Sequence, residues 1–197
     1  VTARSCNGDG ISWQICHDVS VEECRSEDHA GLGLHPGSGS QRSIIRNNTL
    51  DRNNTGIFFC WGVKCGLAEN NTLTDNREYG ISIGHRDDEN IIRKNTVLRS
   101  GKAGLIFRPE RGEGYTARGN LIEGNTFIDT GADGGVAIDI QGVTSGNSIL
   151  RNHIEDSRKS EKSIGIQIGA DTGANRIEAN TFSGIAVPLR DLRTGTA

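Results

Sequence analysis

The stretch His85-Arg86-Asp87-Asp88 holds four ionisable side chains in succession, with no apolar residue among them. An imidazole can act as a general base, a guanidinium can neutralise a carboxylate, and two carboxyl groups can serve as acid and base. The same stretch would be an ordinary solvated turn if no other functional group lay beside it. Which description holds depends on the segments that flank it, "GISIG" before and "IIRKNT" after.

The composition limits the class of protein. A chain of 197 residues is long enough for one domain with a substantial core. No apolar run approaches the roughly 20 residues that span a membrane. The net charge of -3 is opposite in sign to that of most nucleic-acid binders. We therefore expect neither a membrane nor a nucleic acid as partner.

The five cysteines do not form a metal-binding pattern. Their number is odd and no CxxC pair occurs among Cys6, Cys16, Cys24, Cys60 and Cys65. Cys60 and Cys65 flank "WGVK" and could close a small loop. We favour reduced thiols that fill small spaces in the core.

A glycine followed by alternating apolar residues recurs along the chain. The copies begin at Gly10, Gly31, Gly56, Gly80, Gly104, Gly135 and Gly165, with a partial copy at Gly184. Side chains alternate between the two faces of a strand, so the first and third residues after each glycine share a face, and nearly all are large and apolar. One strand cannot bury that face alone, whereas stacked copies form a continuous apolar column.

A second motif, "IIRNNTL" in its clearest form, lies between the glycine strands. Its copies align the asparagines Asn48, Asn71, Asn95, Asn125, Asn152 and Asn180, with Cys24 in the same place of the first copy. A side-chain amide both donates and accepts hydrogen bonds, so stacked copies can bond to one another at a bend. The repeat therefore predicts an asparagine ladder.

On these two repeats the chain resembles the right-handed parallel β-helix superfamily, the pectate-lyase-like solenoids. The resemblance runs from Gly10 to Val187 and implies an all-β fold of about seven coils with three strands each. It implies no single activity, since the superfamily includes lyases, hydrolases, epimerases, phage tailspikes and adhesive repeats. Solenoids need polar caps, and neither end of the sequence provides one. We therefore expect residues 1–197 to be one domain of a longer polypeptide.

In the superfamily the outward face of the glycine strand forms the substrate cleft. Carried over to this chain, that face contains the second and fourth residues after each glycine, among them Arg108 and Asp139 in the fourth position. Because coils stack about 4.8 Å apart, we expect His85 to lie near Arg108, and Arg108 near Asp139. These three residues are the catalytic candidates.

Further residues around this face are candidates for binding substrate. The segment after Arg108, "PERGEGYTARG", is longer than its counterparts and should form a wall beside the site. Phe58 could stack on a sugar ring, whereas His35, next to Pro36, could equally cap a turn. The substrate-binding candidates are His35, Phe58, Trp61, Lys64, Arg86, Asp87, Glu110, Arg111 and Tyr115.

The resemblance favours a carbohydrate-active protein, and we expect lyase chemistry on an acidic, uronic-acid-containing polysaccharide. Elimination needs a cation at the substrate carboxylate, which Arg108, Arg86 or a bound Ca²⁺ could supply, and a base, which His85 or Lys64 could supply.

Two alternatives remain open. A glycoside hydrolase would need paired carboxylates, such as Asp139 with Asp87 or Glu110. A module that binds glycans without cleaving them would instead show an aromatic strip, for example Phe58, Trp61 and Tyr79.

The first residues of the sequence bear on the location of the protein. The first residues, "VTARSCNGDG", lack the basic start and apolar core of a signal peptide. A processed N-terminus would look the same. We expect an extracellular or periplasmic location.

Overall fold

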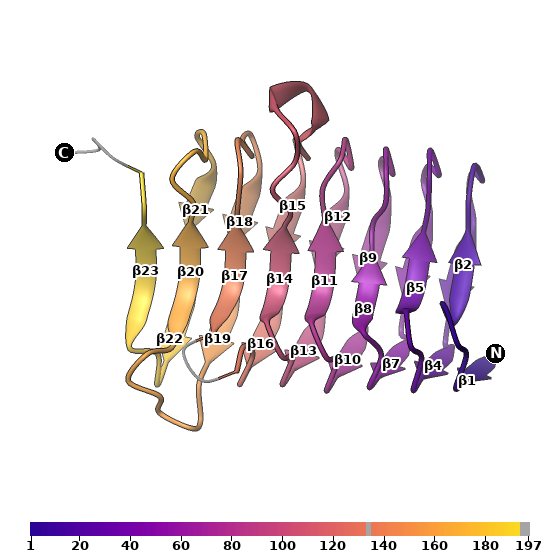
Figure 1. Ribbon diagram of the computed structural model, residues 1–197, viewed down its shortest axis with the longest axis horizontal. Coiled ribbons are helices and arrows are strands. Elements are labelled where there is room, and N and C mark those ends of the chain that lie inside the picture. Colours follow the sequence, from indigo (N-terminus) through magenta and orange to yellow (C-terminus); the bar gives the residue numbers. More distant parts are fainter. Residues whose placement is uncertain (133–134, 194–197) are drawn as a thin grey trace.

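A computed structural model describes residues 1–132 and 135–193 of the chain. The chain winds into a solenoid of stacked coils, and each coil contributes strands to three parallel sheets (Figure 1). Within the described residues the one helical element is a short 3-10 turn, η1 (Glu113–Tyr115). No described helix has the length and apolar character needed to cross a membrane.

Each sheet runs the length of the solenoid. The first sheet contains β2 (Ile11–Trp13), β5 (Leu32–Pro36), β8 (Thr55–Phe58), β11 (Tyr79–Ile83), β14 (Ala103–Phe107), β17 (Val136–Ile140), β20 (Ile164–Ile168) and β23 (Val187–Asp191). The second sheet contains β3 (Ser20–Glu22), β6 (Ile44–Arg46), β9 (Leu67–Glu69), β12 (Ile91–Arg93), β15 (Leu121–Glu123), β18 (Ser148–Leu150) and β21 (Arg176–Glu178). The third sheet contains β1 (Thr2–Arg4), β4 (Arg25–Glu27), β7 (Thr49–Asp51), β10 (Thr72–Thr74), β13 (Thr96–Leu98), β16 (Thr126–Ile128), β19 (His153–Glu155) and β22 (Thr181–Ser183).

The glycine repeat marks where the first sheet packs against the third. A Cβ on Gly80 would overlap Val97, and one on Gly104 would overlap Phe127, both in third-sheet strands. Glycine is needed here for space, because neither of these glycines has a positive φ. The apolar residue that follows each one, such as Ile81, is fully buried in the central column.

The pairing of the strands corrects the expected register in three coils. Leu34 lies opposite Ile11 and Ile57, so the glycine of the second coil is Gly33 and the expected Gly31 is wrong. "GLGL" fits both registers, because apolar residues recur with period two in either.

The same ambiguity affects the C-terminal half. Ile138 lies opposite Leu105, which puts Ala137, not Gly135, in the glycine position. Leu189 lies opposite Ile166, so the final strand is β23 and the partial copy does not start at Gly184.

The predicted asparagine ladder is confirmed at the corner between the second and third sheets. Both the backbone N–H and the side-chain Nδ2 of Asn71 donate to Asn95 Oδ1 at 2.9 Å. Cys24 donates its N–H to Asn48 Oδ1 as expected. Two further ladders, which were not predicted, occupy the other corners: Asn90, Asn120, Asn147 and Asn175 in one, His29, Asn53 and Asn76 in the other.

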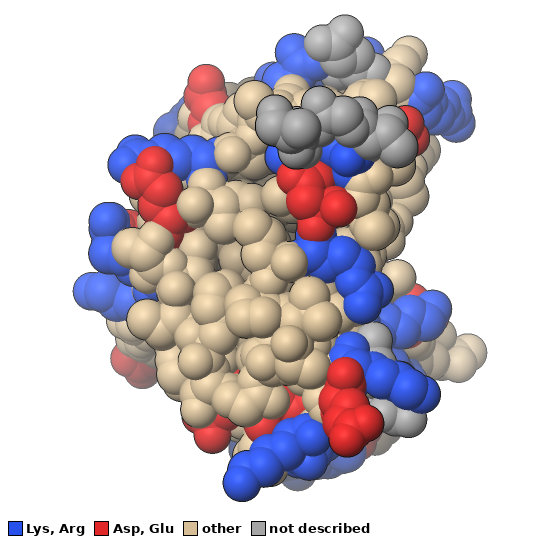
Figure 2. All heavy atoms as spheres, turned by 90° about the vertical axis from the view of Figure 1, so that its left-hand side faces the viewer, with Lys and Arg blue, Asp and Glu red and all other residues tan. Residues whose placement is uncertain are grey.

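The C-terminal end of the solenoid shows its apolar interior. A hollow of about 180 Å³ is lined there by Ile166, Ile177, Phe182 and Leu189, among others. Figure 2 views the molecule from this end, where uncharged atoms fill the centre and charged side chains surround it. All five cysteines are free thiols.

Candidate functional site

Three rings stack along the solenoid at the ends of first-sheet strands. Trp61 follows β8, His85 follows β11, and Tyr115 ends the η1 turn in the insertion after β14. The ring centroids of Trp61 and His85 lie 5.0 Å apart, and those of His85 and Tyr115 lie 5.2 Å apart. This spacing matches the strand-to-strand distance in a sheet. Trp61 is 59% exposed and Tyr115 is 37% exposed. We call these three residues the ring stack.

Arg108 lies beneath the ring stack with its guanidinium fully engaged. Its Nη1 donates to Ser82 Oγ at 2.9 Å, and its Nη2 donates to the carbonyl of Phe59 at 3.0 Å. The guanidinium also covers the ring of Phe58, with its central carbon 4.3 Å from the ring centroid. The side chain thus points toward the preceding coils and leaves little room for a ligand carboxylate.

Asp87 is fully buried and fixes the turns that carry two of the rings. Its Oδ1 accepts the N–H groups of Gly62 and Val63 at 3.0 Å, and its Oδ2 accepts that of Gly84 at 2.9 Å. Arg108 lies 3.3 Å from the same Oδ2. Burial raises the pKa of Asp87 to about 7, although Arg108 and the three amides favour the charged form.

Glu110 joins His85 to Arg108. Its Oε2 lies 3.3 Å from His85 Nδ1, and its Oε1 lies 3.5 Å from Arg108 Nε. The insertion after Arg108 therefore lies beside the site as expected, and it contributes both Glu110 and Tyr115. The expected proximity of His85 and Arg108 holds, with Glu110 between them.

Asp139 is not part of this cluster, and its expected contact with Arg108 is wrong. The corrected register places Asp139 opposite Ile106, in the second position after the glycine slot. Its carboxylate accepts hydrogen bonds from Gln141 and Gln167, at 2.5 and 3.1 Å.

His35 belongs to a separate pair. Its Nδ1 lies 2.7 Å from Asp9 Oδ2, and its ring meets the edge of Phe58 at 5.9 Å. The corrected register also moves His35 from the fourth to the second position after the glycine slot, opposite Ser12.

The other binding candidates lie around the ring stack. Arg86 covers the ring of Tyr115 at 4.6 Å, and Lys64 pairs with Asp88 at 2.9 Å. Arg111 is exposed in the insertion. Of the expected aromatic strip, Trp61 belongs to the ring stack, whereas Phe58 is covered by Arg108 and Tyr79 lies beside Lys102.

Two hollows of the described surface lie away from these residues. Hollows of about 500 and 310 Å³ are both lined by Arg158, in the loop that follows β19 of the third sheet. Neither is lined by His85, Arg108 or Asp139. The expected cleft on the outward face of the first sheet is therefore not among them.

The ring stack could have been found from the sequence. Trp61 and His85 each stand five residues after the glycine of their coil, Gly56 and Gly80. Tyr115 could not be placed in this way, because the insertion breaks the count. Asp9, the partner of His35, precedes the first glycine strand and matches no repeat position.

Residues 3–137 match the family model described as "Periplasmic copper-binding protein (NosD)". The chain belongs to the NosD family. This family assignment agrees with the parallel β-helix, and solved right-handed β-helix proteins have the same fold.

Similar proteins include several that act on alginate. Mannuronan C5-epimerase AlgE5 of Azotobacter vinelandii is 27% identical over 119 residues, which are 59% of this chain and 12% of that protein. The surface adhesin PfbA of Streptococcus pneumoniae superposes with a TM-score of 0.71 at 12% identity, over 96% of this chain and 66% of that one. An alginate lyase of Paenibacillus sp. str. FPU-7 gives 0.67 at 12% identity, over 92% and 69%.

The residues of this chain do not fit the copper centre that the family description names. Copper sites in proteins use Cys, His and Met ligands in close groups. This chain contains no Met. Across residues 1–132 and 135–193, no three His, Cys, Asp or Glu side chains converge as a metal-binding group. Within the same residues, no group of three carboxylates converges to line a Ca²⁺ site either.

Proposed function

We propose that this protein binds an acidic polysaccharide on the ring stack, outside the cell or in the periplasm. The observation that carries the proposal is the row of three rings at the spacing of the coils, with Trp61 well exposed at one end. Exposed aromatic rings on an otherwise polar surface mark binding sites, because burying them against a ligand recovers apolar area. The C–H faces of sugar rings are suitable ligands.

The acidic character of the ligand is proposed from charge and similarity. The guanidinium of Arg86 lies against Tyr115 at one end of the stack and is exposed to solvent. Proteins with similar sequence or fold include a mannuronan epimerase and an alginate lyase, which act on polymers of uronic acids.

Binding is favoured over cleavage by the state of the charged residues. Arg108 is engaged by Ser82, Phe59 and Asp87, so it does not offer a cation to a substrate carboxylate. Asp87 is buried beneath the turns and cannot pair with Glu110 across a glycosidic bond.

Lyase chemistry remains a second candidate on one observation. Glu110 contacts His85 at Nδ1, an arrangement that would orient Nε2 as a base. Incubation with alginate or polygalacturonate, followed by ultraviolet absorbance of unsaturated uronate ends, tests this. Absorbance that is lost in His85→Gln would favour cleavage over binding alone.

The binding proposal is tested by tryptophan fluorescence. The chain has two tryptophans; Trp13 is buried, whereas Trp61 is exposed, so a covered Trp61 should shift the emission to shorter wavelength. We expect this shift with alginate or polygalacturonate and not with dextran. By calorimetry, Trp61→Phe should keep most of the affinity and Trp61→Ala should lose about fivefold or more, since aromatic contacts are worth about 1 kcal/mol or more. Equal affinity of wild type and Trp61→Ala would overturn the proposal.

A further inference from the structure

Ile15 has an unusual position for an isoleucine. It is 80% exposed, and its φ is 54°. A β-branched residue rarely adopts this backbone conformation, and an exposed side chain gains nothing from packing that would offset the strain. Asn or Gly would be the usual residue in such a turn.

Ile15 and Trp61 lie on the two coils that flank the coil of Ser38. The N–H of Ile15 donates to the carbonyl of Ser38, and the N–H of Gly39 donates to the carbonyl of Trp61, both at 2.9 Å. Ser38 thus lies between them in the same column of turns. Two strand spacings separate the backbones of Ile15 and Trp61, roughly 10 Å.

The surface next to Ser38 is open on the side of Gly39. His85 stacks on one side of the indole, which leaves the opposite side toward the coil of Ser38. Ser38 has a short side chain, and a Cβ on Gly39 would meet no atom within 4 Å. On the neighbouring coil, Gln14 Cγ lies 2.7 Å from where a Cβ of Gly37 would be, so Gln14 borders this space.

We propose that Ile15, Ser38 and Trp61 form a clamp for a single pyranose ring of the bound polysaccharide, an inference that rests on the proposed function. A ring in contact with both walls needs about 3.5–4.0 Å on each side, which accounts for most of the roughly 10 Å between them. The indole covers one apolar face of the sugar and Ile15 covers the other. The Ser38 hydroxyl and the Gln14 amide lie at the edges, where sugar hydroxyls need hydrogen-bond partners.

The clamp gives the strained isoleucine a role. Replacing Ile15 by glycine removes the strain and also removes one wall. Stability and affinity should therefore change in opposite directions: a higher melting temperature together with weaker binding. A purely structural role for Ile15 would not separate these two quantities.

The experiment compares four variants by calorimetry with the uronate polymer that shifts Trp61 emission, and by thermal unfolding. We expect Ile15→Gly to weaken binding about three- to tenfold with an equal or higher melting temperature. Ser38→Phe fills the space between the walls and should weaken binding at least as much. Ile91→Ala, at an exposed isoleucine on the second sheet, is the matched control and should bind as wild type. Ile15→Leu keeps an apolar wall and should retain most of the affinity.

The outcomes separate the clamp from the proposed function. If Trp61→Ala weakens binding while Ile15→Gly and Ser38→Phe bind as wild type, the clamp is wrong and the ring stack alone binds the polymer. If wild type binds none of the uronate polymers, the proposed function fails first. If Ile15→Gly instead lowers the melting temperature, the isoleucine is structural and the clamp is again wrong.

Discussion

At the scale of single residues, burial decides which ionisable groups are available to a ligand. The sequence correctly placed His85 near Arg108, but it wrongly placed Asp139 there as well. It could not show that Asp87 is a buried acceptor for three peptide groups, because those groups come from two different coils. Nor could it show that Arg108 turns toward the preceding coils, away from Asp139. Roles of this kind depend on contacts and not on residue type.

His29 gives the stability of the fold a dependence on pH. The side chain is fully buried, and its Nδ1 accepts the N–H of Cys6 at 3.0 Å, so the ring is neutral. Burial lowers the pKa of His29 below its usual value. The unfolded chain binds a proton near pH 6.5, before the folded chain does, so this contribution is present above that pH and is lost as the pH falls.

We expect His29→Asn to be less sensitive to acid than wild type. The asparagine can accept the N–H of Cys6, as Asn53 Oδ1 accepts the N–H of His29 one coil later. Urea midpoints at about pH 7 and pH 5 should differ less in the variant. Asp87 acts in the opposite direction, because its raised pKa makes its share of stability fall as pH rises toward about 7. Both proteins share that effect, so their difference reports on His29. His153→Asn, at a partly exposed histidine, should keep the wild-type slope; equal slopes in all three would rule out this role.

At the scale of elements, a ladder of stacked side chains recurs at three corners of the solenoid. The ladder between the second and third sheets was predictable, since every copy after the first, which has Cys24, carries asparagine at the same distance from its strand. The other two ladders begin or continue with Ser, His or Gly, and a search for one residue type does not find them. The register errors at Gly31 and Gly135 have a related cause: local alternation has period two, whereas only pairing with the next coil selects one of the two registers.

The ladder of His29, Asn53 and Asn76 stops at Ser100, and we expect Ser100→Asn to extend it. Ser100 Oγ is buried without a hydrogen-bond partner. Asn76, in the same place one coil earlier, accepts the N–H of Asn53 and packs against Gly56. Gly80 offers the same space beside Ser100. An asparagine there could accept the N–H of Asn76 and should raise the free energy of unfolding by about 1 kcal/mol.

The control for this prediction is Ser100→Ala. It removes the unsatisfied hydroxyl without adding a ladder bond, so urea unfolding should place it between wild type and the asparagine variant. A destabilised Ser100→Asn would mean that the corner has no room for the amide.

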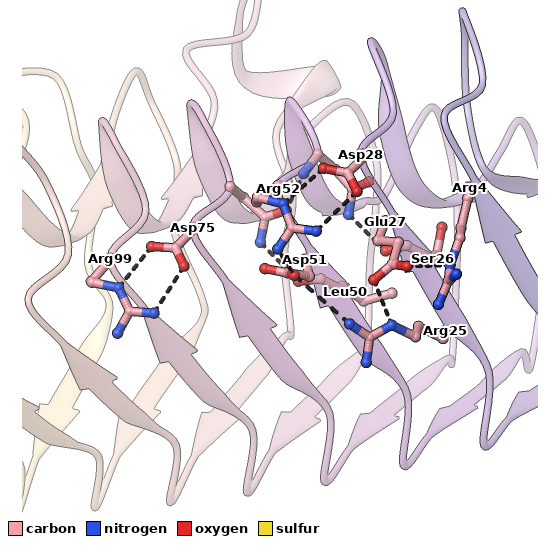
Figure 3. A network of polar contacts seen from close by, with 12 residues as sticks. Arg4, Arg25, Ser26, Glu27, Asp28, Leu50, Asp51, Arg52, Asp75 and Arg99 are labelled. Carbon is pink, nitrogen blue, oxygen red and sulfur yellow. Dashed lines mark hydrogen bonds and ion pairs between the residues drawn. The ribbon is translucent and has the colours of Figure 1, made fainter.

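At the scale of the whole molecule, charged side chains alternate in sign from coil to coil. Along the second sheet, cross-strand neighbours at the strand ends are Glu22, Arg46, Glu69, Arg93 and Glu123. The corner after the third sheet repeats the pattern, with Asp28 bonded to Arg52 and Asp75 bonded to Arg99 (Figure 3). A slip of one coil would put like charges opposite each other in both columns. The alternation therefore helps to specify which coil stacks on which.

Glu69→Arg tests this alternation most directly. Glu69 lies between Arg46 and Arg93, at 3.3 and 2.7 Å, and these guanidinium groups hold the pKa of Glu69 below its usual range. The substitution would place three arginines on successive strands and replace two attractions by two repulsions. Glu69 is buried, whereas Arg46 and Arg93 are partly exposed. Ion pairs that reach solvent contribute about 0–1 kcal/mol each, so reversing two should cost about 1–3 kcal/mol in urea unfolding, and added salt should reduce that cost. Glu178→Arg is the control, because its cross-strand neighbour is the uncharged Leu150 and its exposed ion pair with Arg176 lies within one strand. It should cost less than about 1 kcal/mol. Equal losses in the two variants, or a loss at Glu69 that salt does not change, would show that the charge pattern does not contribute to the order of the coils.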